Sequence, residues 1–536
     1  SCIPTYTNSI RHFRDVDANF VSLFIAHYAP QPQAMSEAIT LKGDDDRASQ
    51  ACAACKKRKG RCDRSIPCCY HCKRRNLPCY YPDKKVKLTS NQTNRFPPAF
   101  FLDYDLFSAS SSKLPPASLE VPSYVSAEIG DYMKQHTIAS QYFATIHLWM
   151  PIVSNPRCFN TLLNPLSFDR ADVALLCLAM KLNLWLPTAS SSDPHTTTYI
   201  AARQFLYGLE ISGTLSLPIL QAAILITIYE IGHAIYPAAY ASISVCIQYA
   251  AALGLEWKTT SWRDGDQDWI ESEERRRVWW AIVILERYIS LGCRQRRIIT
   301  TGPRQDELLP IDDAAWDKEV MVPRYSMTVS APSNINMGRF ARLSQATYLL
   351  DRVLQHLQDS ATFSDALSEE AIQLDKALRA LVAFTESETN RREMRICTQT
   401  ALCQRFMLPY RDTHRFKLTL LITLSGLALL HVPWLYPANE SIATKYRSAL
   451  AWDAMDQLSD RFLNYSKKIL SGTELPILES SPLSLHWSYQ ALVHFCRPSN
   501  KNTPSNRLQA QETIQEALKF AYSRWKLTGD WENKVN

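Results

Sequence analysis

The sequence predicts an all-α protein with two parts, a small unit built on cysteines and a large domain of many helices. Two observations carry this prediction. Six cysteines between residues 52 and 79 form one spacing pattern that occurs twice. From about residue 125 onward, apolar residues recur at helical spacing, and segments that alternate like strands are few. With 46% hydrophobic residues over 536 positions, the chain has ample material for a large core.

The cysteine repeat has the spacing of a metal site. Its two copies, displaced by 17 residues, are Cys52-x2-Cys55-x6-Cys62 and Cys69-x2-Cys72-x6-Cys79. Tetrahedral Zn2+ takes four ligands, so two ions need eight ligand positions. Six sulfurs fill eight positions only if two of them bridge. The repeat therefore predicts a binuclear cluster with two structural zinc ions.

Positive charge is concentrated around the same cysteines. Residues 56–61 carry five cations in six positions, and residues 73–75 add three more. Residues 51–87 have a net charge of +10 against +7 for the whole chain, so the remainder is net −3. A rigid, cationic unit of this kind is typical of a protein that reads nucleic acid.

Every ligand position matches the fungal Zn2Cys6 binuclear-cluster transcription factors, and the segment resembles that family. The resemblance implies that Cys52 and Cys69 bridge the two ions. It assigns the remaining ligands as Cys55 and Cys62 for one ion, and Cys72 and Cys79 for the other. Each ion then has four sulfur ligands and no open position, so the zinc is structural.

Two neighbours of the ligands need an interpretation. Cys68 could replace Cys69, but the spacing Cys68-x3-Cys72 would break the match between the halves. The family tends to place a proline two residues before the fourth ligand, and Pro67 holds that position if the ligand is Cys69. We therefore interpret Cys68 as a bystander thiol. His71 is interpreted as a solvated neighbour, since six thiolates suffice.

The same resemblance implies the DNA contacts. In the family, a short helix after the second cysteine reads a CGG-like triplet with basic side chains before the third cysteine, here Arg58 and Lys59. Lys and Arg donors match the O6 and N7 acceptors of guanine. Phosphate contacts, which set register, are implied for Lys56, Arg61 and Arg64. The expected partner is double-stranded DNA with CGG-like half-sites.

Other classes of protein also have closely spaced cysteines. A disulfide scaffold is disfavoured because it needs an oxidising compartment, to which this chain shows no clear route. A metal store is disfavoured because it would be cysteine-rich throughout, whereas only seven of the fifteen cysteines lie in this segment. An RNA-binding zinc knuckle is a further alternative. Glycine is scarce, at 14 residues, and the common nucleotide, hydrolase and protease signatures are absent. Asp312-Asp313-x3-Asp317 is similar to the Mg2+ site of terpene synthases. A terpene-synthase-like enzyme is therefore the alternative function. The sequence favours the DNA-binding protein, which is expected to have no enzymatic activity.

The predicted domain organisation has four parts. Residues 1–50 form a disordered or non-native extension, and the first methionine, Met35, suggests that residues 1–34 are not part of the natural product. Residues 51–82 form the DNA-binding domain, 83–124 a linker, and 125–525 an all-helical regulatory domain. The linker carries Pro97-Pro98 and no sustained heptad, so the sequence does not predict a coiled-coil dimer at this position and leaves both a homodimer and a monomer open.

The helices of the large domain follow from apolar periodicity. An interior helix is predicted from Pro218 through Tyr229, where apolar residues nearly surround the axis. A second begins with Ser272 as its N-cap and ends at Gly292. The other predicted helices cover residues 238–255, 340–357, 371–384 and 418–430, of which the last is too short to span a membrane.

The large domain resembles the middle homology region that accompanies the fungal zinc clusters. The motifs that carry the resemblance are residues 273–280, 286–288 and 309–313. We interpret Arg275 to Arg277 as a helix face paired with Glu273 and Glu274, with a ligand or partner surface as the alternative. Trp279 and Trp280 are interpreted as core, with a ligand cavity as the alternative.

Residues 96–103 also look like linkers of filamentous-fungal regulators of secondary-metabolite gene clusters. The resemblances together imply a nuclear, sequence-specific DNA-binding regulator of RNA polymerase II transcription. Such a protein acts with the transcription machinery and without a membrane. A role as a pathway-specific regulator of secondary metabolism is the finer expectation.

Overall fold

The protein is described from a computed structural model. It covers residues 51–65, 68–75, 77, 79, 119–164, 170–188, 192–255, 269–292, 297–319, 327–332, 335, 337–359, 369–385, 417–435, 442–471, 481–496 and 504–526. These residues fall into two compact units, one within residues 1–93 and one within residues 94–536. The expectations for the N-terminal extension, Pro67, Pro97-Pro98 and residues 96–103 lie outside the described residues.

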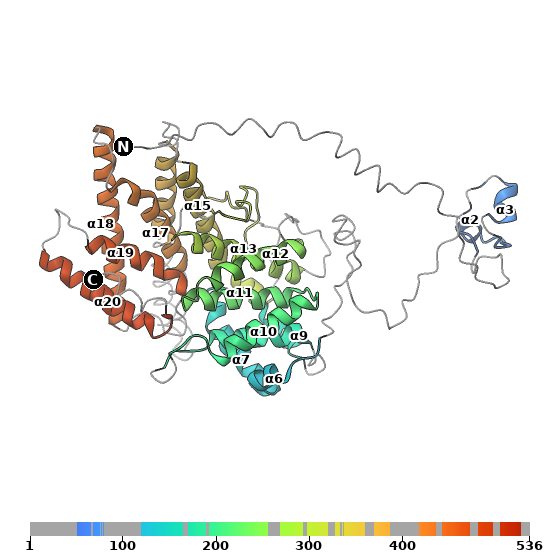
Figure 1. Cartoon of the computed structure of the whole chain (residues 1–536). Coiled ribbons are helices and arrows are strands. Elements are labelled where there is room, and N and C mark those ends of the chain that lie inside the picture. The colour runs from blue at the N-terminus through green and yellow to red at the C-terminus, as the bar shows by residue number, and fades with distance from the viewer. Residues whose placement is uncertain are drawn as a thin grey trace, which may run out of the picture. The chain divides into compact units, whose positions relative to one another are not determined.

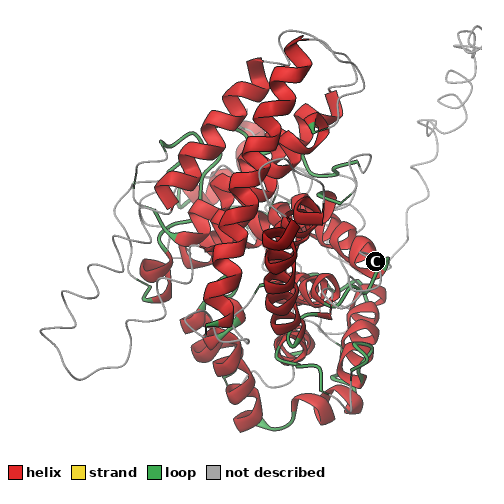
Figure 2. Cartoon of the chain, turned by 90° about the vertical axis from the view of Figure 1, so that its left-hand side faces the viewer, coloured by secondary structure: helices red, strands yellow, loops and turns green. Residues whose placement is uncertain are grey.

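Both units are helical, and the predicted all-α class is confirmed (Figure 1, Figure 2). Within the described ranges the backbone forms no strand, and the large unit has an isolated bridge between Leu308 and Thr328. The small unit contains α2 (Ala53–Lys57) and α3 (Tyr70–Arg74). The large unit begins with α6 (Ser123–Ile129), α7 (Tyr132–Ala144), α8 (Asn155–Arg157), α9 (Ala171–Asn183), α10 (Thr197–Ile211), α11 (Leu217–Gly232), α12 (Ala238–Ala252) and α13 (Trp269–Ser290). It continues with α14 (Asp313–Asp317), α15 (Arg339–Asp359), a helix over 369–385, α17 (Lys417–His431), α18 (Ile442–Leu470), α19 (Leu485–Cys496) and α20 (Pro504–Tyr522).

Helix α11 is the centre of the first half of the large unit. The Ser216 hydroxyl begins the helix by accepting the N–H of Ile219 at 3.4 Å, and Pro218 occupies the first turn, where no N–H is required. All 16 residues of α11 are buried. Helices α9, α10, α12 and α13 pack around it. This confirms the predicted interior helix, because apolar side chains surround its axis.

The second half of the large unit is a group of longer helices. Helix α15 packs along α17, while α18, α19 and α20 pack on one another (Figure 1). Helix α17 matches the predicted core helix, and among the described helices none combines the length and apolar character that a bilayer crossing requires. The C-terminal segment returns to α11, where a β-carbon at Gly232 would lie 2.1 Å from the ring of Trp525. Gly232 is therefore required for this packing.

One predicted helix start was wrong. Helix α13 begins at Trp269, so Ser272 lies inside its first turns and is not the N-cap. Trp269 and Ile270 are half-buried, and these two apolar side chains extend the helix toward its N-terminus. The predicted end is close, because α13 stops at Ser290 and a turn follows at Gly292.

Buried charges fix α13 in the large unit. The Arg277 guanidinium is fully buried, donates to Glu273 at 2.9 Å and to Asp313 at 2.8 Å, and lies 4.1 Å from the ring centre of Trp316. Burial disfavours the charge, but Asp313 and Glu273 outweigh it and raise the pKa of Arg277. This cluster ties α13 to α14 across 36 residues of sequence.

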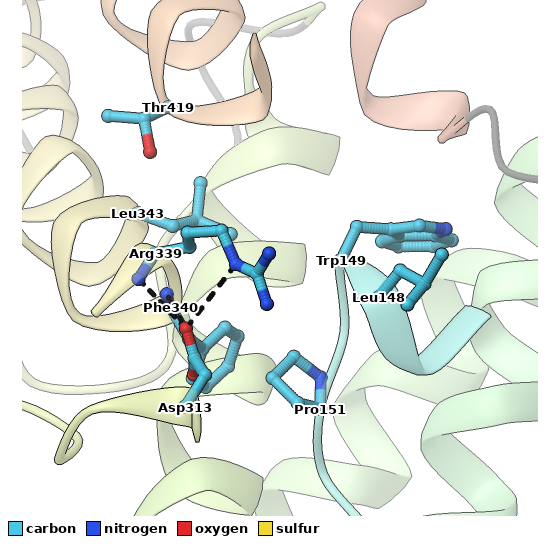
Figure 3. Close-up of a pocket in the computed structure, with 8 residues that line it drawn as sticks. All are labelled: Leu148, Trp149, Pro151, Asp313, Arg339, Phe340, Leu343 and Thr419. Carbon is cyan, nitrogen blue, oxygen red and sulfur yellow. Dashed lines mark hydrogen bonds and ion pairs between the residues drawn. The ribbon is translucent and has the colours of Figure 1, made fainter. Parts of the chain in front are cut away.

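Asp313 extends the same cluster to α15. Its Oδ2 accepts the backbone N–H groups of Arg339 at 2.8 Å and Phe340 at 3.2 Å, which are the first residues of α15 (Figure 3). Ten residues further along α13, the buried Arg287 donates to Asp351 of α15 at 2.7 Å. Helices α13, α14 and α15 are thus held together by charged hydrogen bonds inside the core.

The variant Arg277→Ala should destabilise the large unit by about 3–5 kcal/mol, because it removes the buried guanidinium that both Glu273 and Asp313 share. Urea unfolding followed by tryptophan fluorescence measures this loss. All 13 tryptophans lie at residue 149 or later, so the signal reports the large unit alone.

Arg304→Ala is the matched control. It removes a pair with Asp306 at 3.0 Å whose side chains are 76% and 64% exposed. The expected loss is within about 1 kcal/mol. Equal losses for the two variants would contradict a stabilising role for the buried cluster.

Candidate metal centre and nucleic-acid interface

Two short helices position the cysteines of the small unit. Cys52 is the N-cap of α2 and Cys69 is the N-cap of α3. Each N-cap sulfur accepts the backbone N–H of the next cysteine, Cys55 or Cys72, at 3.4 Å. The Cys-x2-Cys spacing therefore places two sulfurs at the start of each helix, and the two halves of the unit have matching geometry.

The sulfurs gather into two groups of four that share Cys52 and Cys69. The groups are Cys52, Cys55, Cys62 and Cys69, and Cys52, Cys69, Cys72 and Cys79, each with its sulfurs within 4.8 Å of one another. The Cys52 and Cys69 sulfurs are 3.8 Å apart, and the pairs Cys52 with Cys72 and Cys55 with Cys69 are 3.6 Å and 3.8 Å apart.

These distances fit zinc. A Zn–S bond of about 2.3 Å in a tetrahedral site places neighbouring sulfurs about 3.8 Å apart. Two such tetrahedra that share one edge match the two groups, in which Cys52 and Cys69 form the common edge. The small unit thus has a donor set for two zinc ions, with four sulfurs around each.

Burial and hydrogen bonding act on the thiols in opposite directions. Burial raises the pKa of Cys55 to about 12 and also raises the pKa of Cys69 and Cys72, so a cation is needed to hold these sulfurs as thiolates. Burial also opposes ionisation of Cys79, but the N–H of Cys69 donates to its sulfur at 3.3 Å, and the pKa of Cys79 falls to about 7. The N–H of Cys52 donates likewise to Cys62 at 3.5 Å, and the pKa of Cys62 is lowered.

Cys68 and His71 belong to neither sulfur group. Cys68 is half-buried, and its thiol donates to the carbonyl of Cys69 at 3.6 Å. His71 is half-buried on α3 between two cysteines of the second group. The arrangement of the sulfurs agrees with the interpretation of both residues as neighbours of the cluster.

The five residues predicted to contact DNA are all exposed on the small unit, namely Lys56, Arg58, Lys59, Arg61 and Arg64. The resemblance implied a helix after the second cysteine, whereas α2 begins at Ala53 and contains Cys55. Arg58 is the C-cap of this helix, and Lys59 follows directly. The two predicted base-contacting residues therefore lie at the end of α2.

The end of α2 has a defined turn. The N–H of Gly60 donates to the carbonyl of Cys55 at 3.0 Å, and the N–H of Lys59 donates to that of Lys56 at 3.2 Å. This is a Schellman motif, and it requires a left-handed residue, which is Lys59 with φ of 52°. A lysine in this conformation is strained by about 1 kcal/mol, so its side chain is held at a cost in backbone energy.

Asp63 is a residue that the sequence analysis missed. Its carboxylate accepts the N–H of Tyr70 at 3.0 Å, at the first position of α3, and the hydroxyl of Ser65 at 2.5 Å. An acidic group at a helix N-terminus is favourable. In the sequence, Asp63 is an aspartate in the loop between the two cysteine repeats, and nothing in its position beyond its charge indicates that it contacts α3.

The arginine-rich segment of α13 is only partly buried, because Arg277 is fully buried while Arg275 and Arg276 are half-buried. Arg276 and Arg277 both donate to Glu273, as predicted, whereas the prediction was wrong for Arg275, which donates to the Leu253 carbonyl. Glu274 behaves differently, because it accepts from Arg157 at 2.6 Å rather than from its own helix. Trp280 is fully buried and donates its ring N–H to the Leu308 carbonyl at 3.0 Å, as expected for a core residue.

The aspartates that are similar to a magnesium site have separate partners. Asp312 caps α14 by accepting the N–H of Ala314 at 3.0 Å, and Asp317 pairs with His147 at 3.1 Å. Asp313 is bound by Arg277. The three carboxylates therefore share no ligand set, and in the described part of the chain the groups suited to a metal are the two sulfur groups.

A pocket lies beside Asp313 in the large unit (Figure 3). The carboxylate of Asp313 lies at its edge, where it accepts the backbone N–H groups that begin α15. That carboxylate therefore serves the fold. The other lining residues are Leu148, Trp149, Pro151, Arg339, Phe340, Leu343 and Thr419.

Comparison with known protein families matches both units. Residues 50–88 match the fungal Zn(2)-Cys(6) binuclear cluster domain, and residues 139–383 match the fungal specific transcription factor domain. The second match covers the helices from α7 into the helix over 369–385, including the buried charge cluster of α13.

Three curated proteins are similar to parts of this chain. Transcription factor BOA15 of Botryotinia fuckeliana (strain B05.10) is 35% identical over 182 residues, which are 33% of this chain and 98% of that protein. Pigment biosynthesis transcriptional activator pigB of Monascus ruber is 27% identical over 222 residues, or 37% of each chain. Arabinolytic transcriptional activator araR of Emericella nidulans is 35% identical over 49 residues, which are 9% of this chain and 6% of that protein.

The paired sulfur groups, the exposed cations beside them and the matches to both domains agree with one another. A Zn(2)-Cys(6) domain binds two zinc ions, and the sulfur distances here fit that cofactor. The chain belongs to the fungal Zn(2)-Cys(6) transcription factors and is a DNA-binding regulator of transcription with a zinc cluster domain and a helical fungal specific transcription factor domain.

Proposed function

We propose that this protein is a sequence-specific regulator of RNA polymerase II transcription that reads CGG-like half-sites with its small unit. The observation that carries this proposal is the pair of sulfur groups sharing Cys52 and Cys69, directly beside a run of exposed cations. The large unit acts on the transcription machinery, and the site of action is the nucleus. The match to a fungal specific transcription factor domain supports the assignment of regulation to the large unit.

The proposed ligand set has two bridging and four terminal sulfurs. Cys52 and Cys69 bridge, because they belong to both sulfur groups. The terminal ligands are Cys55 and Cys62 for one ion, and Cys72 and Cys79 for the other. Zinc with four sulfur ligands supplies structure rather than catalysis, so the proposed function includes no enzymatic activity.

The proposed DNA interface divides into two kinds of contact. Arg58 and Lys59, at the end of α2, donate to guanine edges in the major groove. Phosphate oxygens are bound by Lys56, Arg61 and Arg64, all of which are exposed. Such contacts make affinity depend on salt but carry no sequence preference.

The proposed organisation of the chain keeps the boundaries drawn from the sequence. Residues 51–82 form the DNA-binding domain and residues 125–525 the regulatory domain, with residues 83–124 as a linker and residues 1–50 as an extension. The division of the described residues into two units supports this organisation. The proposal includes a homodimer that binds two half-sites. The distance between those half-sites is to be measured from the DNA sequences that the protein binds.

The pathway is proposed to be secondary metabolism. One relative is named for the activation of pigment biosynthesis, which supports a role as regulator of a gene cluster for such a product. Mapping the genomic DNA bound by the protein in its source organism tests this directly. Bound CGG-like sites in promoters of one biosynthetic cluster are expected, and an absence of such sites would contradict the proposal.

Lys59→Ala should weaken binding to a CGG duplex by about 10-fold to 100-fold, because it removes a donor to a guanine edge. Binding to random duplexes should change much less. Fluorescence anisotropy of the zinc-loaded full chain at one fixed salt concentration gives both values. Equal loss on the two kinds of DNA would count against a base contact.

Two variants control for the backbone and for charge. Lys59→Gly removes the side chain and also relieves the backbone strain at φ of 52°. It should lose the CGG preference as much as Lys59→Ala does, which would show that the loss comes from the missing amine and not from a change in the turn. Lys56→Ala should weaken both kinds of DNA alike and lower the slope of log affinity against log salt by about 0.9. A sequence-dependent loss in Lys56→Ala would reassign that residue.

Cys52→Ser should reduce zinc below two ions per chain, because one shared sulfur serves both ions and each would keep only three sulfurs. Metal analysis of the purified full chain measures the ratio. Cys68→Ser, which changes a thiol outside both groups, should retain two ions. A Cys52→Ser protein with two tightly held zinc ions would contradict the bridging role.

A further inference from the structure

Helix α10 is apolar on both of its faces. On the inner face, Phe205 and Leu209 pack into the core and are at most 1% exposed. On the outer face, Ile200, Tyr207 and Ile211 are 46%, 63% and 71% exposed. A surface helix normally has a polar outer face, and a contiguous exposed apolar patch marks a contact surface. The outer face of α10 is therefore left uncovered by the described part of the chain.

The outer face has the spacing of a helix–helix contact and carries no charge. The exposed residues of α10 follow one another in steps of three and four, and they are Thr197, Ile200, Gln204, Tyr207 and Ile211. These are the steps of the a and d positions along which two helices pack side by side. Because the face is uncharged, it offers no countercharge to an acidic or basic partner, and two copies of it can meet without repulsion.

The charged residues at one edge of this face are arranged for a second copy. Arg203 and Glu210 lie about two turns apart along that edge. The two-fold axis of an antiparallel helix pair brings the same edges together in opposite directions, so Arg203 of each copy faces Glu210 of the other. The Arg203 side chain is 37% exposed and donates to Ser242 at 2.9 Å, and Glu210 is half-buried and interacts with Tyr249. Both charges are thus held in place by their own copy, and opposite charges meet twice across the pair.

We propose that α10 is a dimerisation surface, whose outer face pairs antiparallel with that of a second copy of this chain. The inference rests on the homodimer proposed above and names its contact surface. An axis between Gln204 and Tyr207 places Ile200 opposite Ile211 of the second copy, and Gln204 opposite Tyr207, so every contact occurs twice. An apolar pair is buried at each end of the contact, and the amide and the phenol at its centre have matching donors and acceptors.

This contact is weak on its own. Stable specific interfaces bury about 1,200–2,000 Å², and a pair of 15-residue helices that meet along one face buries less. A duplex with two half-sites holds two copies close together and so raises their effective concentration. The dimer is therefore expected at high protein concentration in free solution, and at much lower concentration on such a duplex.

Sedimentation velocity of the full chain over a range of concentrations measures self-association without DNA. Ile211→Glu and Ile200→Lys should each weaken it at least about tenfold, because each places an unpaired charge against an apolar side chain of the second copy. The double variant should recover to within about threefold of the wild type, since the introduced charges are opposite and face each other across the pair. The control Ile372→Glu makes the same change on the helix over 369–385, at a side chain 46% exposed, and should leave self-association unchanged.

Recovery in the double variant separates pairing from folding, because two folding defects add whereas two facing charges compensate. Single variants that associate as strongly as the wild type would overturn the inference. A wild-type chain that stays monomeric at every concentration, and binds a duplex with two half-sites no more tightly than a duplex with one, would do the same. Weakened single variants without recovery would overturn the antiparallel pairing. A chain that dimerises as expected but shows no preference for CGG duplexes would overturn the proposed DNA-binding function alone.

Discussion

The small unit depends on the sharing of two sulfurs. Cys52 and Cys69 lie 3.8 Å apart, and in the proposed ligand set they bridge, so that six thiols fill eight ligand positions around two ions. Each of these cysteines also begins a helix, so the metal centre and the secondary structure start at the same residues. Among the described residues of this unit, those that are buried are four cysteines, Cys52, Cys55, Cys69 and Cys72. Metal binding and folding are therefore coupled, and the exposed cations are positioned only once the sulfurs are gathered.

The large unit is organised by a comparable constraint. Arg277 and Arg287 are fully buried, and each is compensated by acidic groups from a different segment. A buried charge that loses its partner is far more costly than an exposed one. Helix α13 can therefore occupy only the position in which Asp313 and Asp351 meet these two guanidinium groups. Apolar side chains from both halves of the large unit form its core, and the buried charges fix the position of α13 in it.

Much of this arrangement could be predicted from the sequence, because it depends on local spacing. The doubled cysteine pattern predicted which sulfurs gather, and the apolar run from Pro218 predicted a helix buried on all sides. The remainder depends on partners distant in sequence. Arg277 meets Asp313 across 36 residues, and a charged stretch at the start of a helix looks equally suited to an exposed face. The left-handed conformation of Lys59 was also hidden, because lysine carries no preference for it.

The complete burial of α11 has a consequence for how the large unit opens. Every residue of this helix is covered, so no face of it can be released while its neighbours stay in place. Amide hydrogens along α11 can then exchange with solvent water only when the surrounding helices separate as well. Amides of α11 should therefore be among the last in the large unit to lose their protection from hydrogen exchange. Their exchange rate reports how often the whole unit opens cooperatively.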